Sequence, residues 1–91
     1  MALSLALEGL KTARDLLGSF NTNAASDLGV AVLQLLAAVK GAWLNVLINT
    51  VSMKDRARAE SFQREGKAIL EEAEALAGDV YRQLEEGMWK S

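Results

Sequence analysis

The 91-residue chain contains no cysteine, no histidine and no proline. Without cysteine it forms no disulfide and no thiolate metal site, and without histidine every mechanism that depends on an imidazole is excluded. Without proline, nothing in the sequence forces a helix to break. What is left for chemistry is a small set of carboxylates, amines, amides and hydroxyls.

Aromatic residues are also scarce, at 5% of the chain, whereas alanine and leucine are abundant. Alanine and leucine are strong helix formers, and no segment shows the alternation of Val, Ile or Thr that a sheet requires. At this length the chain has room for one domain. The predicted fold class is therefore all-α, in a single domain covering residues 1–91.

Charge is nearly balanced, with a formal net charge of −2 and no basic face spread along the chain. Nucleic-acid binding is therefore not expected. The first residues lack a basic leading region, and Glu8 and Lys11 interrupt them too early for a secretory signal. We expect no cleavable signal peptide, and a location in the cytoplasm, in an assembled particle or, alternatively, in a membrane.

The first predicted helix, at about residues 3–17, is amphipathic. Its apolar residues follow helical spacing: Leu3, Ala6, Leu7, Leu10, Ala13, Leu17 and Phe20. A loop is predicted at about 18–26, because Gly18 and two asparagines favour the end of a helix. Ser26 or Asp27 is expected to cap the next helix.

The segment from Leu28 to Met53 extends over more than six helical turns with Lys40 as its only charged residue. A helix that is apolar on nearly all sides has to be covered by protein or by lipid. We predict an apolar helix at about 27–50 and a charged helix at about 54–89. Between residues 49 and 54 the helix either continues as a rod or breaks, and a break would give a helical hairpin or three-helix unit.

Two patterns within these helices suggest close contacts. In the apolar helix one narrow stripe holds small or polar residues: Asp27, Ala31, Gln34, Ala38, Gly41, Asn45 and Asn49. It indicates either a close helix contact or the solvent side of a core helix. In the charged helix a small-residue row recurs every seven residues: Ala59, Gly66, Ala73, Val80 and Gly87. Such a row is typical of a seam between helices.

No candidate for catalysis survives inspection of the sequence. The acidic group Glu71, Glu72, Glu74 and Asp79 has no histidine partner and is interpreted as a solvated face. Phosphate-binding glycine motifs are absent, and the serines have no base to activate them. We predict no catalytic, cofactor-binding or metal-binding residues, no cofactor, no small-molecule substrate and no enzyme activity.

The predicted function is a structural subunit that associates with copies of itself, as a coat, filament, virion or bundle protein. The predicted association interface consists of large apolar residues from both long helices: Leu35, Val39, Trp43, Leu47, Phe62, Ile69 and Leu76. The first alternative is a small membrane protein, single-span or pore-forming, crossing a lipid bilayer at about residues 28–48. Against it, Lys40 would lie near the middle of the span.

The second alternative is a soluble or secreted helical adaptor. Trp43 at mid-chain and the spacing of Tyr81 and Glu85 resemble features of the small helical proteins exported by type VII systems. That resemblance implies a helical hairpin. Trp43 is followed by Leu44 and Asn45 rather than by the x-Gly of that family, so no residue role is carried over.

Overall fold

The computed structural model describes residues 2–15, 17 and 22–90, and the side chains at 22, 23 and 90 are excluded from that description. It contains three helices, α1 (Ala2–Asp15), α2 (Thr22–Val51) and α3 (Arg56–Lys90). No strand occurs in these described residues, so the predicted all-α class is confirmed. The chain is a three-helix unit built on a helical hairpin.

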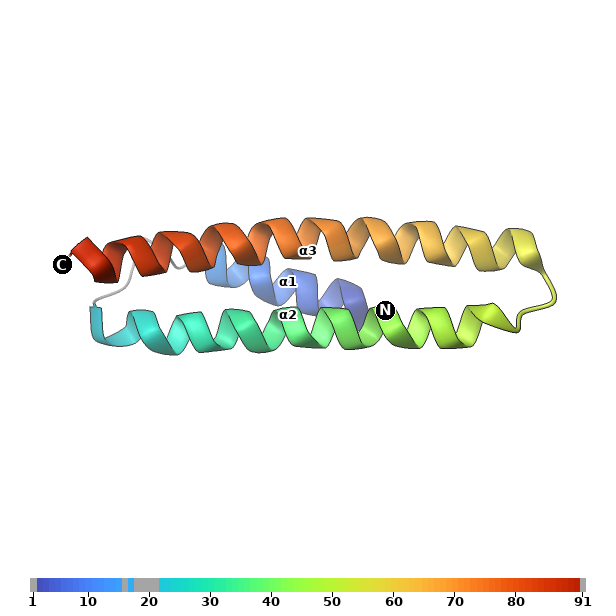
Figure 1. Ribbon diagram of the computed structural model, residues 1–91, viewed down its shortest axis with the longest axis horizontal. Helices are drawn as coiled ribbons and strands as arrows, with labels where there is room; N and C mark the ends of the chain where they lie inside the picture. Colours follow the sequence, from blue (N-terminus) through green and yellow to red (C-terminus); the bar gives the residue numbers. More distant parts are fainter. Residues whose placement is uncertain (1, 16, 18–21, 91) are drawn as a thin grey trace.

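α2 and α3 lie side by side and antiparallel, and the shorter α1 packs beside the middle part of the hairpin they form (Figure 1). The molecule is a rod of 55 × 17 × 15 Å. α1 touches both long helices, and it leaves the end of the hairpin at the α2–α3 turn to those two helices alone (Figure 1). At the other end of the rod, the first turns of α2 and the last turns of α3 likewise extend past α1 (Figure 1).

α1 contributes one apolar side to the core. Its buried residues follow the predicted spacing: Leu3, Ala6, Leu7, Leu10 and Ala13. Leu3 and Leu10 are fully buried, and each such leucine stabilises the fold by about 1.5–3 kcal/mol relative to an exposed one. Leu17 packs against the same core, while Phe20 lies outside the described residues. This helix depends on docking, because 14 residues are too few for a stable isolated helix.

The small-residue row of α3 faces the other helices. Ala59, Gly66, Ala73 and Val80 are buried, whereas Gly87 is exposed. Leu70, Ala77 and Leu84 are also buried in α3. Small side chains at the contact allow helix backbones to approach closely, which is why this row lies in the interior.

The chain breaks between α2 and α3, the second of the two possibilities that the sequence left open. α2 ends at Val51, and α3 begins at Arg56. The Asp55 carboxylate accepts a hydrogen bond from the backbone N–H of Arg58 at 3.0 Å, which is the geometry of an N-terminal cap. The hairpin is therefore closed by a capped turn.

A polar clamp, formed by Thr50, Arg56 and Gln63, holds this turn together. Thr50 is only 3% exposed, and its Oγ1 donates to the carbonyl oxygen of Val46 at 2.6 Å while accepting from Nε2 of Gln63 at 2.8 Å. Arg56 donates to the carbonyl oxygens of Thr50, Val51 and Met53 at 3.0, 3.3 and 3.2 Å. These bonds satisfy carbonyl groups that a helix end leaves unpaired.

The start of α2 differs from the sequence prediction. The helix begins at Thr22, so Ser26 and Asp27 lie inside it rather than capping it. Alanine is the strongest helix former, and Ala24 and Ala25 extend the helix upstream of both residues. The predicted caps at Ser26 and Asp27 are wrong for this reason.

Candidate functional site

Most residues of the predicted association interface lie between helices of a single chain. Val39 is fully buried, and four others pack against the core while remaining partly exposed: Leu35, Trp43, Ile69 and Leu76. Phe62 is half-buried near the turn, and Leu47 is 37% exposed on α2. The structure therefore divides these seven residues between the interior and the surface, and association through them stays a prediction.

Two glycines show how closely these side chains pack. A Cβ atom added at Gly9 of α1 would lie 2.9 Å from Cδ2 of Leu35, and one added at Gly66 of α3 would lie 2.9 Å from Cζ3 of Trp43. The ammonium of Lys67 lies 5.9 Å from the centre of the Trp43 ring, within the range of a cation–π contact. Leu35 and Trp43 therefore make close contacts between helices of the three-helix unit.

A groove of about 470 Å³ lies where the first turns of α2 meet the last turns of α3. This volume is within the range of small-molecule sites. Residues from both helices line it: Ala25, Ser26, Gly29, Val30, Leu33, Tyr81, Leu84, Glu85, Met88 and Trp89. We refer to this site as the end groove.

The end groove combines apolar walls with a few polar groups. Tyr81 and Trp89 supply aromatic rings that are 42% and 87% exposed. Glu85 supplies a carboxylate, and Ser26 supplies a hydroxyl on the opposite helix. Exposed rings beside a carboxylate suit a flat, partly polar ligand, which can stack on the rings and hydrogen-bond to the acid.

Sequence reasoning did not find the end groove because its walls are about 50 positions apart in the chain. Only the hairpin brings residues 25–33 next to residues 81–89. One signal was present: Met88 and Trp89 are large apolar residues at the end of a charged helix. Large apolar side chains exposed at a helix end indicate an interaction site when they gather into a patch.

A second candidate surface is the side of α2 that faces away from α1 and α3. Large apolar side chains are exposed along its length: Val30, Leu33, Leu44, Leu47, Ile48 and Val51. Within the described residues, one helical stretch, Ala24–Val51, is long and apolar enough to cross a membrane by length and composition, and little of it is buried. The core helix of a small bundle meets the same criterion, so this finding is weak evidence for a membrane.

The small and polar stripe of α2 lies beside this apolar surface. Gln34, Gly41, Asn45 and Asn49 are all exposed. The sequence allowed two interpretations of this stripe, a close helix contact or the solvent side of a core helix. Within one chain the stripe lies on the solvent side.

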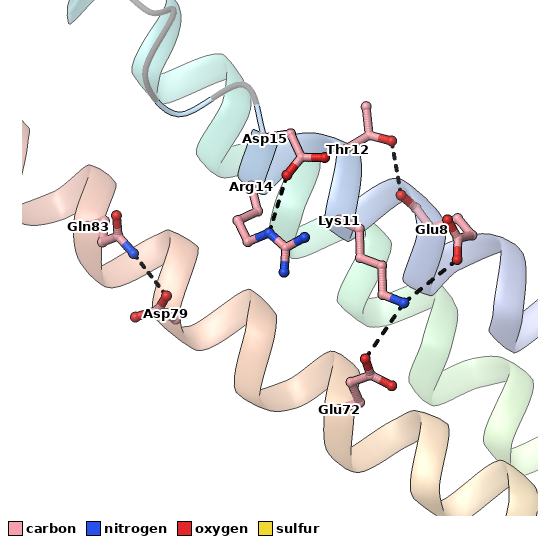
Figure 2. Close-up of polar contacts among 8 residues, drawn as sticks. All are labelled: Glu8, Lys11, Thr12, Arg14, Asp15, Glu72, Asp79 and Gln83. Carbon is pink, nitrogen blue, oxygen red and sulfur yellow. Dashed lines mark hydrogen bonds and ion pairs between the residues drawn. The ribbon is translucent and has the colours of Figure 1, made fainter.

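Several charged residues in the described part of the chain form surface ion pairs, some of which are drawn in Figure 2. The Lys11 ammonium lies 3.8 Å from the Glu8 carboxylate and 3.7 Å from that of Glu72, joining α1 to α3. Lys40 lies 3.8 Å from Glu74 in the same way, joining α2 to α3. Exposed pairs of this kind contribute about 0–1 kcal/mol each.

The acidic group of α3 thus lies on the surface, where two of its carboxylates pair with lysines. Searching the described residues for clusters of His, Cys, Asp or Glu that could hold a metal ion finds none. A third member of the acidic group, Asp79, accepts hydrogen bonds from Arg82 and Gln83. These contacts leave the end groove as the candidate small-molecule site.

Comparison with known proteins finds similarity to enzymes. A family model described as Formiminotransferase-cyclodeaminase matches residues 1–68. A methenyltetrahydrofolate cyclohydrolase of Methylorubrum extorquens is 44% identical over 61 residues, which are 67% of this chain and 29% of that protein. The chain therefore spans less than a third of the length of this relative. No solved structure matches the chain.

These matches overturn the predicted function. A non-enzymatic structural subunit of a coat, filament or virion was wrong, as was the prediction that the chain has no enzymatic role. The membrane-protein and adaptor alternatives are likewise not what the matches indicate. The error has a physical origin, because a helix that packs inside a small bundle carries the same apolar pattern as one that builds a coat.

Proposed function

Because the chain belongs to the formiminotransferase-cyclodeaminase family, we propose that it is part of an enzyme that hydrolyses the one-carbon bridge of methenyltetrahydrofolate. The observation that carries this proposal is the match over residues 1–68, which contain α1, α2 and the beginning of α3. The cyclohydrolase relative supports the substrate class.

The proposed reaction sets clear requirements for a site. Water adds to the cationic methenyl carbon, one of its two C–N bonds then breaks, and the products are a formyl group and a released proton. The enzyme has to hold a flat bicyclic ring and to accept the proton of the attacking water. A site of this kind needs aromatic or apolar walls and at least one base.

The end groove meets these requirements with residues of both long helices. We assign Tyr81 and Trp89 to stacking on the ring system and Glu85 to accepting the proton from water. Ser26 and Gly29 belong to the opposite wall, and a Cβ atom added at Gly29 would lie 3.9 Å from Cδ1 of Leu84, which also lines the groove. The α2 wall lies within the residues that match the family, whereas the α3 wall lies beyond residue 68.

The test measures both binding and turnover by the purified chain. Binding is followed by isothermal titration calorimetry, which needs no fluorescent residue and therefore measures variants of Trp89 in the same way as the parent chain. Turnover is followed by loss of the methenyl absorbance, corrected for spontaneous hydrolysis. We expect Trp89→Ala to weaken binding and Glu85→Gln to lower the turnover rate by about 10²-fold while the affinity stays similar.

The matched control is Glu71→Gln, which makes the same chemical change on α3 outside the groove. Its binding and turnover should equal those of the parent chain. A chain that neither binds methenyltetrahydrofolate nor accelerates its hydrolysis would contradict the proposed function. Equal losses in Glu85→Gln and Glu71→Gln would remove Glu85 from the role of base.

A further inference from the structure

Three side chains of the end groove follow one another along one side of α3. Tyr81, Glu85 and Trp89 are spaced four residues apart, and all three line the groove. Side chains four positions apart on a helix lie one above the other, and each such step advances about 6 Å along the axis. The two aromatic residues are thus about 12 Å apart along α3, and a carboxylate lies midway between them.

The opposite wall, on α2, has a different character at its two ends. The added Cβ of Gly29 would lie 3.9 Å from Cδ1 of Leu84, so these two residues face each other across the groove. Because α2 and α3 are antiparallel (Figure 1), counting outward from this contact places Ser26 near Trp89 and Leu33 near Tyr81. The groove therefore has an indole and a hydroxyl at one end, and a phenol and an apolar side chain at the other.

Exposure to solvent differs between the two ends in the same direction. Trp89 is 87% exposed, whereas Tyr81 is 42% exposed, and Leu84 between them is buried. An open end with an indole and a hydroxyl suits a flat ring that carries several polar groups, because those groups keep their contact with water. The more enclosed end, beside Leu33, suits an apolar ring.

The proposed substrate, methenyltetrahydrofolate, has two ring systems of these two kinds. Its bicyclic ring carries amino and amide groups, and its second ring is the benzene ring of an aminobenzoyl group. The one-carbon bridge joins a nitrogen of the bicyclic ring to the nitrogen of the aminobenzoyl group. The carbon that water attacks therefore lies between a polar ring and an apolar one.

We propose that the end groove contains two separate ring subsites with the base between them. The bicyclic ring stacks on Trp89 and hydrogen-bonds to Ser26, and the aminobenzoyl ring lies against Tyr81 and Leu33. The one-carbon bridge is then opposite Glu85, the residue assigned to accept the proton of the attacking water. This inference rests on the proposed function and adds the direction in which the substrate lies along α3.

A single ring held by both aromatic side chains fits the groove less well. Side chains of a helix lean toward its N-terminus, so Tyr81 and Trp89 lean the same way and do not converge on one ligand ring. A bicyclic ring is also shorter than the separation of about 12 Å along the axis. Two ring systems joined by a short bridge use both aromatic residues.

The test uses the two halves of the substrate as separate probes, pterin for the bicyclic ring and 4-aminobenzoylglutamate for the other. Binding to the isotopically labelled full chain is followed by amide chemical shifts. We expect pterin to shift the amides of Ser26 and Trp89, and 4-aminobenzoylglutamate to shift those of Leu33 and Tyr81. Saturation with one probe should leave the Kd of the other within about twofold, because the two occupy different parts of the groove.

Single substitutions should separate the two subsites. Trp89→Ala should raise the Kd of pterin at least about fivefold and leave that of 4-aminobenzoylglutamate within about twofold, because stacking on the indole is lost. Tyr81→Ala should have the reverse effect. The control is Leu5→Ala, which removes an exposed apolar side chain of α1 outside the groove and should change neither Kd. Circular dichroism checks that each variant keeps its helicity.

Three outcomes would overturn the two subsites. The first is mutual displacement of the two probes, and the second is equal weakening of both probes by each substitution, since either result means one shared ring site. The third is absence of binding by both probes. An exchanged dependence, with pterin relying on Tyr81, would overturn the assigned direction.

These measurements do not depend on turnover, so they distinguish the subsites from the proposed reaction. Separate binding of the two probes by a chain that does not hydrolyse methenyltetrahydrofolate would support the subsites and contradict the reaction. Hydrolysis by a chain on which the probes displace each other would support the reaction and contradict the subsites.

Discussion

The ring of Trp43 lies against the backbone of Gly66, so closely that a Cβ atom added to the glycine would be 2.9 Å from Cζ3 and 3.0 Å from Cε3. The ring belongs to α2, and the missing side chain of Gly66 in α3 leaves the space that the ring occupies. Leu3 of α1 completes the contact, with Cδ1 at 3.5 Å from the same added atom. All three helices therefore meet at one position.

Gly66→Ala should destabilise the fold. Alanine gains about 1 kcal/mol in helix propensity, but overpacking against a rigid ring costs about 1–3 kcal/mol, so we expect a net loss. Urea or thermal unfolding measures it, and for a domain of this size each 1 kcal/mol lowers Tm by about 4–8 °C. Gly78→Ala is the control, because its Cβ meets no atom within 4 Å, and it should stabilise by up to about 1 kcal/mol. Equal effects of the two changes would contradict the packing of Trp43.

Thr50→Val should destabilise by about 1–2 kcal/mol. The change keeps the shape of the side chain but removes the hydroxyl that accepts from Gln63, leaving a half-buried amide without that partner. Thr12→Val is the matched control, since Thr12 makes the same bond to the carbonyl of residue i−4 at an exposed position. The control should change the free energy of unfolding by less than about 0.5 kcal/mol.

Arg56→Lys should loosen the end of α2. All three hydrogen bonds to the carbonyl groups of the turn come from one guanidinium nitrogen, Nη1, which lies one bond farther from the backbone than the ammonium nitrogen of a lysine, so the shorter lysine side chain should lose part of this contact. We expect faster amide exchange in the last turn of α2 and a loss of about 1 kcal/mol in the free energy of unfolding. Arg64→Lys, on the same helix and outside the turn, should change neither quantity.

Removal of the Lys40–Glu74 ion pair should cost little. Both side chains are about half exposed, and the closest nitrogen and oxygen are 3.8 Å apart. Glu74→Gln should therefore change the free energy of unfolding by less than about 1 kcal/mol, and high salt should reduce even that difference. A larger loss, measured by urea unfolding at low and high salt, would mean that this pair fixes the packing of α2 on α3.

The sequence predicted the fold class and the core side of α1, because both depend on local spacing. A 3.6-residue apolar period identifies the buried side of a helix wherever the helix packs, and Leu3, Leu7 and Leu10 are buried as that period requires. The break between α2 and α3 was left open, since its cause is not local. It is fixed by Arg56 and Gln63, whose hydrogen bonds with Thr50 exist only once the hairpin has formed.

The candidate site could not be predicted in the same way. The end groove depends on the pairing of α2 with α3. In addition, a stripe of large apolar residues has the same sequence pattern whether it packs inside one chain or between two chains. Val39 and Leu47 illustrate this, because the spacing of eight residues gave both as interface residues while the structure buries one and exposes the other. The relation to an enzyme family came from similarity to known proteins rather than from any motif that we recognised in the sequence.

Because α1 is short, local stability should differ along the rod. Beyond Gly66, towards the turn, only Thr50 and Ala59 are buried, and no third helix supports the hairpin (Figure 1). A two-helix segment with so small an interior should open and close many times for each global unfolding event. The polar clamp formed by Thr50, Arg56 and Gln63 thus holds together the part of the molecule that should open most easily, and the end groove lies at the opposite end of the rod, between α2 and α3.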